Sequence, residues 1–176
     1  MRNERGFTLA ELLVAIAVVG LLMSALFVTL LQGQSAFLFG AGRAEVQQNG
    51  RLALAKMIEE LRTGSAVTAV TATSVTFLFL DDAGVSTTVQ YSLAGTNIQR
   101  NQTVPAPAAA QPETLVGGVT SLTVTCFDQN DAVTAVPANA FSVQVRITTQ
   151  PERPLAGYSP ANQQVVFQDR VKMRNK

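Results

Sequence analysis

The chain of 176 residues carries 13 Lys and Arg against 12 Asp and Glu, and the net charge of +1 gives no electrostatic footprint for nucleic acid. It contains no histidine, which removes the usual general base and the commonest metal ligand. Cys126 is the only cysteine, so an internal disulfide is excluded. The composition therefore predicts a protein that is not an enzyme, has no cofactor, and is an unlikely nucleic-acid binder as an isolated domain.

The first predicted element is an apolar helix that follows a short polar leader. The run 7–31 contains one ionisable residue, Glu11, and is long enough to span a bilayer core. A carboxylate within a membrane helix costs free energy, so Glu11 is expected to have a partner. A secretory signal has a shorter apolar stretch that ends at a small-residue cleavage site. A plain membrane anchor fits the length but leaves Glu11 unexplained.

The boundary between leader and helix, residues 5–11, reads RGFTLAE. This segment resembles the class III signal of type IV pilins and of the pseudopilins of type II secretion. The resemblance implies that a prepilin peptidase cuts between Gly6 and Phe7 and methylates the new amino terminus of Phe7. It also implies that Glu11, as the fifth mature residue, pairs with the positive amino terminus of a neighbouring subunit during assembly.

The helix is expected to continue to about Arg62, because the first proline in the chain is Pro105. Beyond the apolar run, an apolar stripe recurs at helical spacing and is formed by Leu54, Met57, Ile58 and Leu61. Glu60 falls outside this stripe. Thr63 and Gly64 supply a stop, with Gly64 at a plausible C′ position.

Residues 1–6 are thus interpreted as a leader, 7–33 as the transmembrane and assembly half of the helix, and 34–63 as its amphipathic half. Gly20 lies within the first half. It can serve close packing between helices. Alternatively, by resemblance to the family, it can be a hinge where the helix melts on assembly. The sequence leaves both possibilities open.

From residue 64 onward the apolar pattern changes to period two, which predicts antiparallel strands. The segments 74–80 and 86–93 form a hairpin around a turn at 81–84. Further strands are expected at 121–127, 141–148 and 164–168, with surface loops at 104–112 and 150–160. The predicted fold class is α+β, in which the long helix packs on an antiparallel β domain of residues 64–176. By resemblance to the pilin family, this arrangement is a pilin-like roll.

Two acidic turns present hard oxygen donors of the kind that calcium prefers: Asp81, Asp82, Asp128, Asn130 and Asp131. Asp and Asn are also the residues that hairpin turns favour for backbone reasons, and neither cluster has EF-hand spacing. We expect no metal site, with calcium at Asp81, Asp82, Asp128 and Asp131 as the alternative. The tail 170–176 carries four cations on alternate positions. They either protect an exposed sheet edge or attract anionic lipid or an acidic neighbouring subunit.

The sequence is most similar to a W-type minor pilin or a J-type type II secretion pseudopilin. The resemblance implies a single-pass protein of the bacterial inner membrane with its C-terminal domain outside the cytoplasm. It would then be assembled into a type IV pilus, a DNA-uptake pilus or a type II secretion pseudopilus, priming or capping the filament. Implied partners are prepilin peptidase, other pilins or pseudopilins through the helix, the inner-membrane assembly platform and lipid. Two alternatives remain: a tip-located recognition module that binds a surface, a secreted substrate or DNA, and a plain membrane-anchored β-rich protein.

Overall fold

The computed structural model describes residues 6–80, 84–106, 110–152 and 163–174. The chain divides into two compact units, Met1–Ala41 and Gly42–Lys176. One long helix, α1 (Leu9–Thr63), contributes its first part to one unit and its second part to the other. The second unit therefore contains the last turns of this helix together with the strands, which confirms the predicted α+β class.

The helix ends at Thr63, close to the predicted stop, and strand β1 begins at Gly64. The glycine is needed for a different reason from the one expected, because Gly64 is not among the residues with positive φ. A Cβ at this position would lie 2.9 Å from the carbonyl oxygen of Leu61. Gly64 thus lets the chain turn closely over the last helical turn, and it is not a left-handed cap.

The first sheet consists of five antiparallel strands in chain order. They are β1 (Gly64–Thr71), β2 (Ser74–Leu80), β3 (Ser86–Ala94), β4 (Asn97–Val104) and β5 (Glu113–Val116). The pairing of β2 with β3, from Ser74 opposite Ser92 to Leu80 opposite Ser86, confirms the predicted hairpin. The strands β1, β4 and β5 were not predicted.

The second sheet is also antiparallel and has the order β7-β6-β8-β9. Its strands are β6 (Val119–Phe127), β7 (Val133–Thr134), β8 (Ser142–Thr149) and β9 (Val165–Lys172), with a short 3₁₀ helix, η1 (Pro137–Asn139), between β7 and β8. Strands β6, β8 and β9 confirm the predicted strands, with β9 extending further towards the C-terminus. The strands therefore form two sheets. Two backbone hydrogen bonds connect them: the N–H of Val119 donates to the carbonyl oxygen of Thr96, and the N–H of Val124 donates to that of Ala72.

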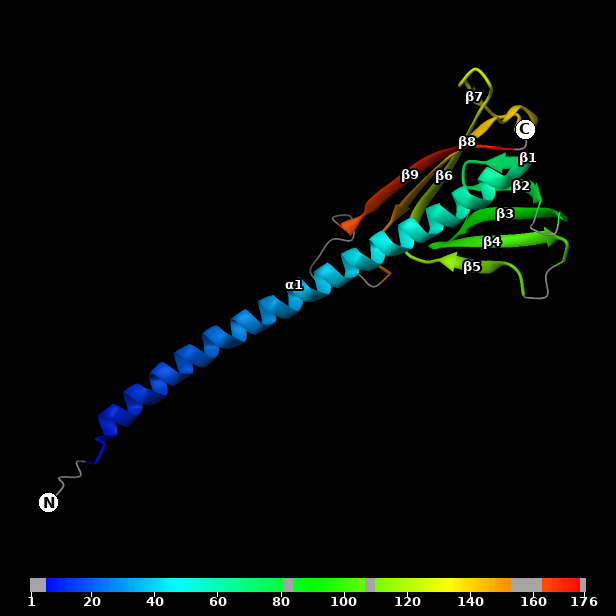
Figure 1. The fold of residues 1–176 in the computed structure, drawn as a ribbon. Coiled ribbons are helices and arrows are strands. Elements are labelled where there is room, and N and C mark those ends of the chain that lie inside the picture. Colours follow the sequence, from blue (N-terminus) through cyan, green and yellow to red (C-terminus); the bar gives the residue numbers. More distant parts are fainter. Residues whose placement is uncertain (1–5, 81–83, 107–109, 153–162, 175–176) are drawn as a thin grey trace. The chain divides into compact units, whose positions relative to one another are not determined.

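The core of the second unit lies where α1 runs across both sheets (Figure 1). Met57, Ile58 and Leu61 of the predicted stripe are buried, and Leu54 is partly buried against them. They pack with side chains of both sheets, among them Phe77, Tyr91, Ile98, Leu122, Val145 and Ile147. Burying one such helix side chain contributes about 1.5–3 kcal/mol, so this stripe fixes the helix to the strands.

Candidate functional site

The predicted cleavage point precedes the helix. Gly6, Phe7 and Thr8 lie outside regular secondary structure, and α1 begins at Leu9. All three residues are exposed, and the side chain of Phe7 is 89% accessible. The peptide bond between Gly6 and Phe7 is therefore in irregular, accessible backbone, which is the kind of segment that proteases cut.

Glu11 closes a reciprocal hydrogen-bond pair with Thr8 at the start of α1. Its Oε2 accepts the backbone N–H of Thr8 and the Thr8 hydroxyl, both at 2.9 Å. The Oγ1 of Thr8 in turn accepts the backbone N–H of Glu11 at 3.2 Å. This is a capping box, in which an N-cap Thr and a Glu three residues later satisfy each other's donors. Within a single chain the partner of Glu11 is thus Thr8, and the Thr-x-x-Glu spacing that signals it was missed in the sequence.

The side chains of the apolar segment are turned outward along the first part of α1. This is the only described helix long and apolar enough, by length and composition, to cross a membrane, with a mean hydropathy of 2.7 in its most apolar window. Large apolar side chains from Leu9 to Leu31 are between 47% and 80% accessible. Gly20 lies in this helix, and a Cβ there would have nothing within 4 Å. Its role in close packing or as a hinge stays a prediction.

The acidic turn after β6 is organised by its own backbone. Oδ1 of Asp128 accepts the backbone N–H of Asn130 at 2.8 Å and of Ala132 at 2.9 Å. Asp131 has a φ of 66° and forms an ion pair with Arg170. Among the described residues no group of three or more His, Cys, Asp or Glu side chains could hold a metal ion. The turn explanation accounts for Asp128, and Asp81 and Asp82 lie outside the described residues.

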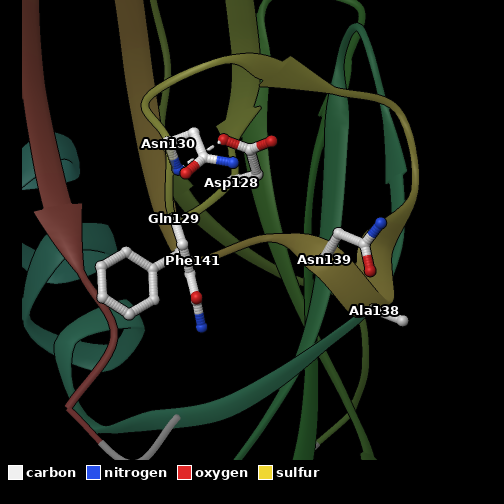
Figure 2. A pocket seen from close by; sticks show the side chains of 6 residues that line it. All are labelled: Asp128, Gln129, Asn130, Ala138, Asn139 and Phe141. Atoms are coloured by element: carbon white, nitrogen blue, oxygen red, sulfur yellow. Dashed lines mark hydrogen bonds between the residues drawn. The ribbon is translucent and has the colours of Figure 1, made fainter.

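A hollow of about 290 Å³ lies between this turn and η1. Figure 2 shows Asp128 and Asn130 on the turn, Asn139 and Ala138 on the far side, and the ring of Phe141 beside Gln129. Two further hollows, of about 380 and 540 Å³, share Phe141 with it. This end of the second unit thus carries three neighbouring hollows that share Phe141.

A buried charge network joins α1 to the first sheet. Glu60 is 7% accessible, although sequence periodicity placed it outside the buried stripe. It accepts the hydroxyl of Tyr91 at 2.9 Å and Nε of Arg100 at 3.1 Å, and Nζ of Lys56 lies 3.3 Å from Oε1. Tyr91 is on β3 and Arg100 is on β4, so one helical carboxylate holds two strands.

The network also shifts the protonation of its members. Burial, followed by the negative charge of Glu60 and the hydrogen bond to it, raises the pKa of Tyr91 far above its usual value. Burial opposes the charge of Arg100, but the hydrogen bond and charge of Glu60 outweigh it, so the pKa of Arg100 is raised. The carboxylate of Glu60 is therefore the shared acceptor of a neutral phenol and a guanidinium.

Comparison with known proteins gives one match to the N-terminal segment and one match to the fold. Residues 1–27 match the family model described as the prokaryotic N-terminal methylation motif. No curated protein matches the sequence significantly. Among solved structures, the fold is similar to the type IV-like pilin TTHA1219 from Thermus thermophilus, with a TM-score of 0.52 and 12% sequence identity. The match covers 73% of this chain and 97% of that one, and at this identity it concerns the fold alone.

The chain thus combines an N-terminal methylation motif with a type IV pilin-like fold. The region that matches the methylation motif contains Gly6, Phe7, Glu11 and Gly20. The motif implies processing by prepilin peptidase and pilin assembly in general, and together with the apolar helix it indicates membrane anchoring. The structure brings Glu11 next to the cleavage segment through Thr8, whereas the acidic residues of the β domain belong to a separate unit.

Proposed function

We propose that this protein is a minor pilin or pseudopilin subunit that primes or caps a type IV pilus, a DNA-uptake pilus or a type II secretion pseudopilus. It has no catalytic role. Prepilin peptidase cuts between Gly6 and Phe7 and methylates Phe7, and the mature chain remains a single-pass protein of the inner membrane. Its β domain lies outside the cytoplasm until the assembly platform adds the subunit to a filament through α1. The observation that carries this proposal is the methylation motif at the start of a long exposed apolar helix, joined to a pilin-like fold.

The geometry of the leader supports the processing step. The bond between Gly6 and Phe7 is two residues ahead of Leu9, where α1 begins, and both residues are exposed. A peptidase therefore reaches it without unwinding the helix. After cleavage, Thr8 is the second residue of the mature protein and still caps α1 with Glu11.

The geometry of Glu11 supports a role in assembly. Both hydrogen bonds that its carboxylate accepts from Thr8 end on Oε2. Among the contacts of the described residues, Oε1 accepts no hydrogen bond. The second oxygen is thus available to the positive amino terminus of a neighbouring subunit, in a segment whose apolar surroundings strengthen such a pair.

Intact mass and N-terminal sequencing of the protein from its native membrane test the proposal directly. We expect a chain that begins at N-methylated Phe7. Gly6→Ala should still insert into the membrane but keep the six-residue leader, whereas Gly33→Ala, with equal space for a Cβ, should be processed normally. A wild-type chain that retains its leader in a host with active prepilin peptidase would show that this is a plain membrane anchor.

A further inference from the structure

One end of the second unit gathers cations around an apolar floor. The hollow of about 540 Å³ is lined by four cationic residues, Arg62, Arg170, Lys172 and Arg174, and none of the described residues that line it is acidic. Phe141 and the buried Met173 also line it. We call Arg62, Lys172, Arg174 and Phe141 the cationic surface. In it Lys172 lies over the ring of Phe141, and Arg62 and Arg174 line the same hollow.

Three of these cations have no anionic partner among the described residues. Arg170 is engaged, because it pairs with Asp131, donates to Oγ of Ser142 and lies 3.8 Å from the ring centroid of Phe127. Lys172 lies 4.3 Å from the ring centroid of Phe141. In the described part of the chain, neither it nor Arg62 nor Arg174 forms an ion pair. Within the part of the chain that the structure describes, no ion pair therefore compensates the positive charge of the cationic surface.

The cations are spaced along an edge strand. Arg170 and Lys172 occupy alternate positions of β9, the outermost strand of the second sheet, and Arg174 follows at the same interval. Alternate residues of a strand are about 6.6–6.8 Å apart, which is also the spacing of alternate carboxylates on an extended peptide. The N–H of Arg170 is already bonded to Oδ1 of Asp169 at 2.7 Å. This N–H is therefore not free to pair with an added strand, which favours recognition through the side chains of β9.

The position of the surface disfavours lipid. The backbone N–H of Arg174 donates to the carbonyl oxygen of Arg62, so β9 and α1 end together at this surface. The helix enters the unit at Gly42, about 30 Å of helix earlier. The surface thus lies at the far end of the unit from the point where the chain arrives from its apolar segment.

Nucleic acid fits the surface less well than protein. Single-strand binders stack bases on open aromatic rings. Here Phe127 and Phe141 each carry a cation of the same chain over the ring. The net charge of +1 also gives no broad positive field.

We propose that the cationic surface binds an acidic segment of a partner protein, with carboxylates on Arg62, Lys172 and Arg174 and an apolar side chain beside Phe141. The three uncompensated cations and the apolar floor of one hollow carry this assignment. It goes beyond the assembly role of α1 and does not depend on it, because its residues lie in the second unit.

The test uses the full chain in detergent micelles and fluorescence anisotropy with three labelled probes. One probe is a peptide with Glu at alternate positions separated by Leu and Thr, the second has Gln in place of Glu, and the third is oligothymidylate of equal charge. The variant K172Q/R174Q should weaken binding of the acidic peptide about fivefold or more, an effect that grows at low salt. The double variant R43Q/R51Q makes the same charge change on exposed positions of α1 and should leave binding unchanged.

A charge-reversal variant distinguishes a specific loss of binding from a folding defect. K172E/R174E should lose the acidic peptide and gain a matching peptide with Lys in place of Glu. Three results would overturn the proposal: equal binding of the Gln peptide, equal weakening by R43Q/R51Q, or tighter binding of oligothymidylate that depends on Lys172 and Arg174.

Discussion

Removal of the Glu60 carboxylate is the sharpest test of how the helix is fixed to the first sheet. Glu60→Ala leaves the guanidinium of Arg100, which is 15% accessible, and the hydroxyl of Tyr91 without their shared acceptor. Breaking a buried ion pair from one side costs about 3–5 kcal/mol, because the other charge remains buried. In a domain of this size the loss lowers the melting temperature by about 6–20 °C. Glu60→Gln keeps an acceptor but loses the charge, and should cost about 1.5–3 kcal/mol.

The assay is thermal unfolding of the full chain in detergent, followed by the β-sheet signal in circular dichroism. Glu59→Ala is the matched control on the same helix, because its side chain is 74% accessible and forms an exposed ion pair with Lys56 at 3.9 Å. It should change the stability by less than about 0.5 kcal/mol. Equal melting temperatures for the Glu60→Ala and Glu59→Ala variants would refute the view that the buried network holds α1 on β3 and β4.

Three further predictions follow from single contacts. The raised pKa of Tyr91 means that above about pH 10 the unfolded chain releases a proton that the folded chain keeps, so stability falls with rising pH by about 1.4 kcal/mol per unit. In a series of urea unfolding curves Tyr91→Phe should flatten that slope, and parallel slopes would contradict the assignment. Gly50→Ala should destabilise the second unit by about 1–3 kcal/mol, because its Cβ would overlap the ring of Phe167, whereas Gly40→Ala meets open space and should show no loss in the same melts. Glu11→Gln should leave processing intact, seen as a mature N-terminus, but reduce incorporation into filaments in shear fractions; normal incorporation would argue against its pairing role.

Strong periodicity made much of the fold predictable. In β2, Val75 and Phe77 are fully buried while their neighbours are less so, and this alternation was visible in the sequence. The strand β4, by contrast, has a polar sequence in which Ile98 is the one fully buried residue. The position of β4 depends on the contact between Arg100 and Glu60 of α1, two residues that are forty positions apart in the sequence. No local pattern contains that information.

The short strands escaped prediction for related reasons. β5 has four residues and β7 has two, and such segments are strands only because a longer neighbour pairs with them. β1 consists of small residues and pairs with β2 through two register shifts, so its alternation is blurred. Glu60 was misplaced because a helical stripe predicts which face is buried and not which polar residue at its margin finds partners on a sheet.

The N-terminal site shows how one residue, Glu11, can both cap its own helix and remain able to pair with another subunit. Sequence alone made Glu11 an unpaired charge in an apolar helix, and therefore pointed to another subunit. The structure gives it Thr8 as an internal partner, at the helix end where the macrodipole favours a carboxylate. Because both hydrogen bonds use Oε2, the cap and an intermolecular ion pair do not exclude each other. A carboxylate held by its own helix start arrives at a neighbour already oriented, which lowers the entropy lost on pairing. The capping box thus supports the proposed assembly role of Glu11, since it fixes the charge in place before the partner is met.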